Sequence, residues 1–290
     1  MEFERNLEEN VFELQAQLKT SGYRHGAYVP FTIWDPKQRR IHKATVRDRL
    51  VHQAVVTAIE PLFEPGFIYD SFSCRVGKGT HAGVKRLRQF LAKTSQNDQR
   101  PVYALKCDIH QFFASVDHKK LLDLLSIKIE DQQTLVLLNE IINSFSMSSG
   151  KAIPLGNLTS QLFANVYMHE LDWFIKHTLR QKHYIRYCDD FVIVGTNRNE
   201  LVALVEPINN FLVSCLGLQL HPRKVSIRSW SQGIDFLGYV LKPHCVVLRS
   251  KTKNRILKRV DHANISSYLG VCSHANAYKL QQTLLNKLWL

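Results

Sequence analysis

The sequence has few of the features that mark secreted, zinc-binding or membrane-spanning proteins. Its six cysteines are scattered, with no Cys-x-x-Cys pair and no histidine at zinc-ligand spacing, which is typical of reduced thiols and unlike a disulfide framework or a zinc module. No apolar run approaches the roughly 20 residues that span a bilayer, and the polar, acidic N-terminal segment is unlike a secretory signal. Internal repeats and low-complexity segments are also missing. These absences predict a soluble, cytoplasmic protein with no membrane partner.

Acidic residues are scarce relative to basic ones. The chain of 290 residues has 38 lysines and arginines against 25 aspartates and glutamates, a formal net charge of +13. Such an excess favours a polyanionic partner, because each phosphate that a cation neutralises releases counterions. The N-terminus has no basic amphipathic helix of the kind that binds membrane surfaces. The charge therefore indicates a nucleic acid as the partner.

Two adjacent carboxylates stand at the tip of a predicted hairpin. Asp189 and Asp190 end a Tyr-Cys-Asp-Asp segment that lies between two apolar half-strands, residues 184–187 and 191–195. Neighbouring carboxylates repel one another and raise each other's pKa, a cost that a divalent cation removes. The pair therefore fits a metal-holding hairpin. A simple surface turn is the alternative, since Asp-Asp is common in turns.

A third carboxylate ends another predicted strand, residues 102–108. Asp108 is followed by the aromatic pair Phe112 and Phe113, and residues 154–161 (PLGNLTSQ) then open a long predicted helix. A strand-terminal acid of this kind is a candidate third ligand for a cation held by the hairpin. Taken alone, the two phenylalanines also fit a role as core aromatics.

The order of these motifs resembles that of the palm motifs of reverse transcriptases. Asp108 with Phe113, the loop at residues 154–161, the Tyr-Cys-Asp-Asp hairpin, Lys224 after Gly217, and Phe-Leu-Gly-Tyr near the end follow the family's order. The resemblance covers nearly the whole chain. It implies an RNA-directed DNA polymerase, which is a nucleotidyltransferase.

The resemblance also implies a fold. We expect an α+β right-hand polymerase fold with fingers at residues 1–100, a palm at residues 101–244 and a small helical thumb at residues 245–290. The palm would be an antiparallel sheet packed on helices, carrying the catalytic carboxylates and the primer grip. A polar loop at residues 94–100 marks the expected edge between fingers and palm.

Hydrophobic periodicity gives a coarse secondary structure for the second half of the chain. Apolar residues at helical spacing predict helices over residues 134–145, 158–171 and 199–216. The last helix is expected to be capped by Asn199 and to end at Gly217. Residues 218–227 and 234–241 are expected to be strands.

The family resemblance assigns roles to the motif residues. Two Mg²⁺ ions, for which Mn²⁺ can substitute, would be held by Asp108, Asp189, Asp190 and the Ile109 carbonyl. Lys224 would join the acids as a catalytic residue by protonating the pyrophosphate leaving group, although an exposed lysine is the alternative interpretation. The primer grip would consist of Phe236, Leu237, Gly238 and Tyr239.

A further set of residues is expected to contact the incoming nucleotide or the template. Phe113 would be a steric gate that favours deoxynucleotides. A basic, aromatic N-terminal region suits phosphate clamping and base stacking, or is a solvated basic face. The complete expected set is Arg40, Arg49, Arg75, Phe113, Leu155, Gly156 and Gln161.

The C-terminal segment differs from the palm in composition. Residues 249–259 (RSKTKNRILKR) contain six basic residues and no acid. Beside a polymerase palm such a run is typical of a thumb helix that grips the primer-template duplex through its phosphates. A solvated helix face is the alternative.

Details of the motifs resemble one branch of the family, the reverse transcriptases of diversity-generating retroelements. The loop reads Leu155-Gly156 and Ser160-Gln161 where most reverse transcriptases have Gln-Gly and Ser-Pro, and residues 48–51 (DRLV) also match this branch. A glutamine amide would hydrogen-bond the incoming nucleotide, whereas leucine can only pack, so fidelity should fall. A neutral packing role for Leu155 is the alternative.

This branch implies a biological setting. Its members copy a template RNA into cDNA from a DNA or RNA primer and dNTPs, misincorporate opposite template adenines, and diversify a target gene by mutagenic retrohoming. They work in the bacterial cytoplasm, some encoded by a phage or mobile element, with a small basic oligomeric accessory protein. The acidic, apolar stretch at residues 2–13 is one candidate surface for that protein.

Three alternatives stay open at this point. The chain could be another bacterial reverse transcriptase, of the retron, group II intron or phage-defence kind. It could be a non-catalytic RNA-binding protein with the same fold, although the intact Asp108, Asp189 and Asp190 argue against that. It could also be a terminal transferase, which shares the palm chemistry and needs no template.

Overall fold

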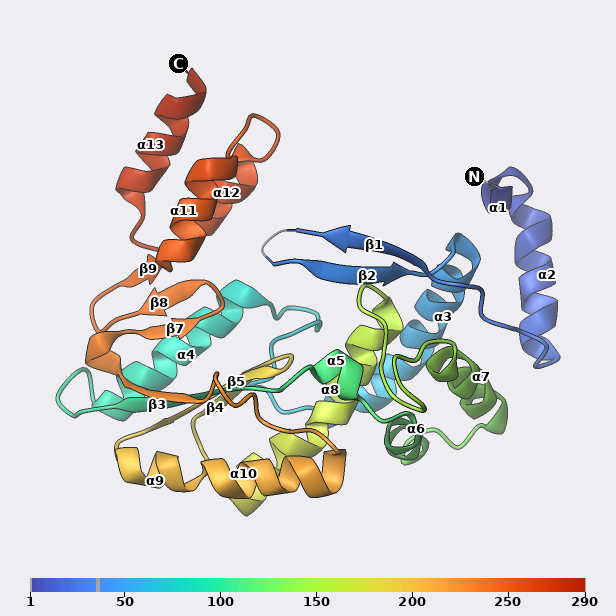
Figure 1. Ribbon diagram of the computed structural model, residues 1–290, viewed down its shortest axis with the longest axis horizontal. Helices are drawn as coiled ribbons and strands as arrows, with labels where there is room; N and C mark the ends of the chain where they lie inside the picture. The colour runs from blue at the N-terminus through green and yellow to red at the C-terminus, as the bar shows by residue number, and fades with distance from the viewer. Residues whose placement is uncertain (1, 35–36, 290) are drawn as a thin grey trace. The chain divides into compact units, whose positions relative to one another are not determined.

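The structure is a computed structural model that describes residues 2–34 and 37–289. The chain is α+β, as the sequence predicts, and divides into two compact units built from interleaved segments (Figure 1). The first unit contains the chain up to residue 69, residues 109–178 and residues 207–222, and the second contains residues 70–108, residues 179–206 and the chain from residue 223 onward.

The first unit is mainly helical. Helices α3 and α8 pack against each other, because apolar side chains recur along α3 at helical spacing and α8 is buried around most of its circumference. The helices of this unit are α1 (Glu2–Arg5), α2 (Leu7–Lys19), α3 (Val46–Phe63), α5 (Phe112–Ser115), α6 (His118–Ser126), α7 (Gln132–Asn143), α8 (Leu158–Trp173) and most of α10 (Val205–Phe211). A 3-10 turn (Glu64–Gly66) follows α3, and a π-helical turn (Phe174–Thr178) follows α8.

A two-stranded antiparallel hairpin, β1 (Val29–Ile33) and β2 (Arg39–Lys43), joins the loop that precedes α8. The backbone N–H of His42 donates to the Leu155 carbonyl at 3.1 Å. The Asn157 side chain donates to the His42 carbonyl at 2.8 Å and accepts from the Ala44 N–H at 3.3 Å. These three bonds fix the Pro-Leu-Gly loop against β2.

The second unit is built on a four-stranded antiparallel sheet with the order β4-β5-β3-β6. The strands are β3 (Tyr103–Asp108), β4 (Tyr184–Tyr187), β5 (Asp190–Gly195) and β6 (Ser226–Ser229). Helix α4 (Thr80–Ser95) covers one face, where its Leu87 and Leu91 share a buried cluster with Ala104 and Val192. Helix α9 (Arg198–Ala203) packs on the opposite face, with Leu201 against Gly195.

A smaller sheet and three helices complete the second unit. Strands β7 (Ile234–Phe236), β8 (Tyr239–Leu241) and β9 (Val246–Leu248) form an antiparallel sheet that shares the buried cluster under α4. The chain then forms α11 (Ser250–Arg259), α12 (Ile265–Ser273) and α13 (Tyr278–Trp289), the orange to red helices of Figure 1. These helices enclose their own core of Ile256, Val260, Cys272, Leu280 and Leu284.

The expected elements around the motifs are confirmed, with corrections at their ends. The helix expected over residues 199–216 is α9, α10 (Val205–Phe211) and a π-helical turn (Leu212–Leu216). Its cap is Asn197 and not Asn199, because the Asn197 side chain accepts from the N–H groups of Asn199 and Glu200. It ends at Gly217 as expected, in the left-handed conformation that glycine adopts at helix ends.

Two expected strands and one loop are also corrected. Residues 234–241 form a hairpin and not one strand, because Leu237 and Gly238 both have positive φ, 50° and 91°, as a tight two-residue turn requires. Of the strand expected over residues 218–227, only residues 226 and 227 are in a strand, at the start of β6, and Leu220 forms an isolated bridge with Ile109. Helix α4 runs to Ser95, so the expected loop at 94–100 begins two residues later.

The boundaries expected for fingers, palm and thumb stay predictions. The expected fingers include Met1, Asp35 and Pro36, and the expected thumb includes Leu290, which lie outside the described residues. Among the helices of residues 2–34 and 37–289, none is both long enough and apolar enough to cross a membrane.

Gly156 offers a test of the contact between the hairpin and the Pro-Leu-Gly loop. Its φ is +100°, and an added Cβ would lie 2.5 Å from Cγ2 of Ile41. Gly156→Ala should lower the free energy of unfolding by about 3 kcal/mol through backbone strain and overpacking together. Gly150→Ala is the matched control, since Gly150 has φ +66° with nothing within 4 Å of an added Cβ, and it should cost about 1 kcal/mol. If urea titrations give the same loss of unfolding free energy for Gly156→Ala and Gly150→Ala, the close contact between Gly156 and Ile41 is contradicted.

Candidate active site

The three acidic motif residues converge in the second unit. Asp108 lies opposite Asp190 in the antiparallel pairing of β3 with β5, and directly opposed residues have their side chains on the same face of a sheet. Asp189 directly precedes Asp190, in the turn between β4 and β5, where Cys188 has a φ of 56°. The pairing register therefore gathers carboxylates that are 81 and 82 positions apart in the sequence.

Two lysines contact these carboxylates. The Lys224 ammonium lies 2.7 Å from Oδ1 of Asp108, and the Lys106 ammonium lies 3.1 Å from Oδ2 of Asp190. The second oxygen of Asp190, Oδ1, is buried and has no hydrogen-bond partner among the described residues. Buried carboxylate oxygens are normally satisfied, so this atom indicates a missing ligand.

Burial makes the hairpin carboxyls hard to ionise. It raises the pKa of Asp189, and the charge of the neighbouring Asp108 raises it further. Burial also raises the pKa of Asp190 to about 6, against the lowering effect of the Lys106 ammonium. Burial and the nearby Asp189 raise the pKa of the Cys188 thiol as well, which keeps this thiol neutral. The site thus presents oxygen donors and no thiolate.

This donor set fits Mg²⁺. Magnesium takes hard oxygen ligands and is usually held in proteins by only one or two carboxylates together with water and substrate phosphates. A divalent cation would supply a partner for Asp190 Oδ1 and offset the repulsion among the three acids. Within the described ranges, no three His, Cys, Asp or Glu side chains form a group that could hold a metal ion by themselves.

A buried arginine contacts the turn of the hairpin and is not among the site residues predicted from the sequence. Arg186, in β4, is fully buried and donates from Nη1 to the Cys188 carbonyl at 3.1 Å. The backbone of Arg186 pairs with the segment around Ser71. Its N–H donates to the Asp70 carbonyl, and its carbonyl accepts from the Phe72 N–H. A basic residue inside an apolar half-strand was the available signal. Arg186 holds the turn in the shape that presents Asp189.

The Phe-Leu-Gly-Tyr segment forms the β7–β8 hairpin in the same unit. Phe236 and Tyr239 are buried, whereas Leu237 and Gly238 are half-buried at the turn. The Tyr239 hydroxyl lies 3.0 Å from the Val271 carbonyl, to which it donates, and 3.0 Å from Nε2 of His81. These contacts fix the hairpin to α12 and α4.

Several of the expected nucleotide contacts come together in the first unit. The Phe113 carbonyl accepts from the Ile153 N–H at 2.8 Å, and the Leu155 carbonyl accepts from β2. Arg40, on the exposed hairpin, directly precedes Ile41, against which Gly156 packs. Phe113, the Pro-Leu-Gly loop and β2 thus form one group.

The other expected contacts are placed separately. Arg49 is exposed in the first turn of α3 and Gln161 is exposed in the first turn of α8. Ile109 is buried in the first unit, where it bridges to Leu220. Arg75 belongs to the second unit, where its guanidinium donates to the Ser71 carbonyl at 3.0 Å.

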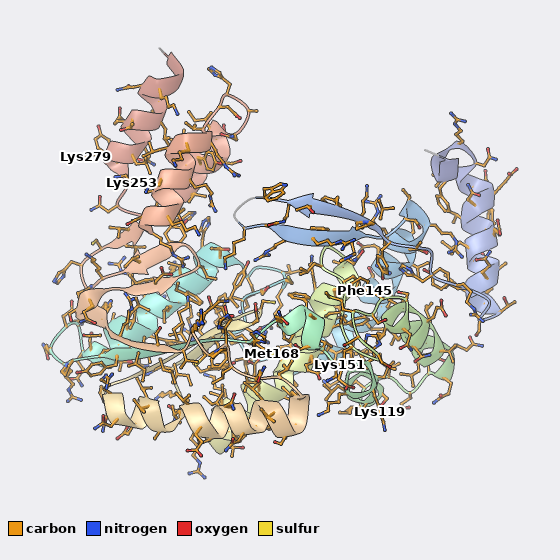
Figure 2. The ribbon with its side chains drawn as sticks, viewed as in Figure 1. Lys119, Phe145, Lys151, Met168, Lys253 and Lys279 are labelled. Atoms are coloured by element: carbon orange, nitrogen blue, oxygen red, sulfur yellow. The ribbon has the colours of Figure 1, made fainter. Side chains whose placement is uncertain are left out.

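A cleft of about 530 Å³ lies between β9 and the C-terminal helices. Lys253 of α11 and Lys279 of α13, both labelled in Figure 2, line it, but half of its lining residues are aliphatic: Val247, Leu248, Ala277 and Leu280. The two ammonium groups suit phosphate oxygens.

Residues 34–241 match the family model described as reverse transcriptase (RNA-dependent DNA polymerase). This match covers most of the chain, and the chain belongs to that family. The family resemblance inferred from the motifs is therefore confirmed.

Two bacterial relatives illustrate the similarity. The chain is 24% identical over 252 residues to protein YkfC of Escherichia coli K12, covering 74% of this chain and 65% of that protein. It is 23% identical over 287 residues to the group II intron-encoded protein LtrA of Lactococcus lactis, covering 76% of this chain and 46% of that protein. The chain thus spans less than two-thirds of the length of these curated relatives.

Solved structures share the fold at low sequence identity. Telomerase from Candida albicans, in complex with the TWJ fragment of telomeric RNA, aligns with a TM-score of 0.60 at 12% identity, covering 93% of this chain and 55% of that chain. Apo telomerase from Candida tropicalis, truncated from its C-terminal domain, aligns with a TM-score of 0.56 at 12% identity, covering 83% and 60%. The expected α+β polymerase fold is confirmed.

The raised pKa of Asp190 predicts a pH-dependent stability. A carboxyl whose pKa is higher in the folded than in the unfolded chain binds its proton more tightly when folded, so its ionisation lowers the free energy of unfolding. Without divalent cations, the wild type should therefore lose stability relative to Asp190→Asn as the pH rises from about 4 to about 6, by about 2 kcal/mol at most.

Chemical denaturation across this pH range measures the effect. Asp123→Asn, at an exposed carboxylate of α6, is the control. Adding Mg²⁺ above pH 6 should stabilise the wild type more than Asp190→Asn, because a ligand that binds only the folded state stabilises it. If the free energy of unfolding depends on pH in the same way in all three proteins, ionisation of Asp190 does not destabilise the fold.

Proposed function

We propose that this protein is an RNA-directed DNA polymerase that copies a template RNA into cDNA by adding dNTPs to the 3′ end of a DNA or RNA primer. The observation that carries the proposal is the convergence of Asp108, Asp189 and Asp190 at one end of the central strands β3 and β5, in a chain of the reverse transcriptase family. In this reading the basic C-terminal helices are the thumb and the β1–β2 hairpin belongs to the fingers.

The three carboxylates would hold two Mg²⁺ ions, with Mn²⁺ able to substitute and the Ile109 carbonyl as a further ligand. Such ions lower the pKa of the primer 3′-hydroxyl and neutralise the charge on the triphosphate. The backbone of the turn, held by Arg186, and the strand pairing of Asp108 keep the acids in place. Asp190 has one oxygen on Lys106 and the other without a hydrogen-bond partner in the part of the chain that the structure describes, and it would support the site.

The remaining residues bind substrate and move one proton. Lys224, 43% exposed and 2.7 Å from Asp108, can deliver a proton to the leaving pyrophosphate. Phe113 would exclude a ribose 2′-hydroxyl. Arg40, Arg49 and Arg75 would contact triphosphate or template, and the β7–β8 hairpin would hold the primer end.

Primer extension tests the proposal directly. Purified protein with Mg²⁺, a defined RNA template and a primer should extend the primer with dNTPs, and Asp189→Ala should lower the rate by about a thousandfold or more, as expected when a metal ligand is removed. Asp123→Asn, which removes an exposed acid, should extend normally. Equal extension by Asp189→Ala and wild type would contradict the assignment of the site.

The finer proposal is that the enzyme belongs to a diversity-generating retroelement, acts in the bacterial cytoplasm, and misincorporates opposite template adenines during mutagenic retrohoming. Its support is the Leu155-Gly156 sequence in a half-buried loop whose backbone is bonded to β2. A leucine there can pack against a nascent base pair and offers no hydrogen bond to it. A small basic oligomeric accessory protein would be a further partner.

Leu155→Gln tests this finer proposal. The new amide can hydrogen-bond the incoming nucleotide, so errors opposite template adenines should fall by about tenfold, the effect of roughly one added hydrogen bond. Sequencing the cDNA from a template of balanced composition measures the error rate for each base, and Leu155→Met is the control that keeps an apolar side chain. Accurate copying by the wild type would instead place the enzyme in another branch, such as the intron, retron or phage-defence enzymes.

A further inference from the structure

A row of charged side chains leads from Asp190 to the start of α11. The Lys106 ammonium lies 3.1 Å from Oδ2 of Asp190, donates to the backbone carbonyl of Asp235 at 3.2 Å, and lies 3.9 Å from Oδ1 of Asp235. The Asp235 carboxylate in turn pairs with the guanidinium of Arg249. The four side chains alternate in sign, and all belong to the second unit.

Each member of this row belongs to an element with a place in the proposed site. Lys106 stands two positions before Asp108 on β3, so the two side chains share one face of the sheet. Asp235 is the middle residue of β7 and directly precedes Phe236. Arg249 is the N-cap residue of α11, and its N–H donates to the Gly238 carbonyl at 3.0 Å. Arg249 therefore contacts both the strand and the turn of the β7–β8 hairpin.

The partial burial of these side chains makes their contacts stronger than ion pairs at the surface. Lys106 is 22% exposed and Asp190 is 21% exposed, against 35% for Asp235. Exposed ion pairs contribute little to stability, whereas partly buried, charge-assisted hydrogen bonds are shorter and stronger. A lysine ammonium has three donors and no acceptor, so Lys106 can hold Asp190 and the Asp235 carbonyl at the same time. The bond from Lys106 to the Asp235 carbonyl can therefore persist when a cation binds to Asp190.

We infer that Lys106 and Asp235 are positioning residues that tie the β7–β8 hairpin and the start of α11 to the carboxylate site. The inference rests on the proposed function, because the purpose of the tie is to keep the primer end in register with the acids that activate it. Neither residue touches the reacting atoms. Their effect is exerted through Asp190 on one side and through Gly238 and α11 on the other.

Hydrogen exchange tests the tie without reference to activity. In Lys106→Met and in Asp235→Asn, the amides of residues 234–241 and 249–259 should exchange several-fold faster than in the wild type, while those of β4 and β5 should not change. Lys85→Met removes an exposed lysine of α4 and is the matched control. Asp235→Asn removes the carboxylate that pairs with Lys106 and Arg249 but keeps the Lys106 bond to the Asp235 carbonyl. The double variant should therefore exchange at least as fast as Lys106→Met, and its effect should be smaller than the sum of the two single effects, because the substitutions share the Lys106–Asp235 ion pair. Unchanged exchange in both single variants would overturn the inference.

Steady-state kinetics then test its consequence. Where the wild type extends primers, Lys106→Met and Asp235→Asn should each lower kcat by about tenfold, the factor that a modest misplacement of the primer end produces. The KM for dNTP and the affinity for primer-template should not change, whereas a general loss of folding would change all three together. Altered exchange in a protein that extends no primer would support the tie and contradict the proposed polymerase function, whereas active variants with unchanged kcat would overturn the positioning role.

Discussion

The repulsion among three neighbouring carboxylates is the constraint on which the rest of the second unit depends. Asp108, Asp189 and Asp190 are brought together by strand pairing and a tight turn, and burial makes ionisation of the last two costly. Lysines approach two of the acids and the Arg186 guanidinium holds the turn. Repulsion and burial at these acids lower the local stability, and a divalent cation bound there would offset that loss. The two lysines offset part of it in the structure itself.

The first unit meets a different requirement, which is close packing around a loop. Phe113, the Pro-Leu-Gly segment and β2 are joined by backbone hydrogen bonds, and Gly156 leaves no room for a side chain beside Ile41. The contacts inside this group are made by carbonyls, amides and apolar surfaces, while β2 adds the exposed cations Arg39, Arg40 and Lys43. At position 155 itself, leucine can contact a nucleotide only by shape, because it offers no hydrogen bond.

Much of this organisation could be predicted from the sequence, and what could not be predicted has physical reasons. The strands that carry Asp108 and Asp190 and the long helix α8 were predicted because their apolar patterns are local, and the family was recognised from motif order. Asn199 was wrongly chosen as a cap because two nearby asparagines have the same propensity and only geometry selects Asn197. Lys106 and Asp235, 129 positions apart, meet through tertiary structure, which no local pattern encodes. The roles of individual site residues, the domain boundaries and the branch of the family stay predictions.

Arg186 makes the shape of the turn independent of the charge on the neighbouring acids. An arginine keeps its charge at every pH at which proteins are folded, so its bond to the Cys188 carbonyl does not weaken as protons come and go. The carboxyl of Asp190, on the strand that follows the turn, has a pKa of about 6 and changes charge within the ordinary working range. The hydrogen bond that shapes the turn is therefore independent of pH, whereas the charge of Asp190 is not. Asp190 can gain or lose a proton while the bond from Arg186 to the turn is kept.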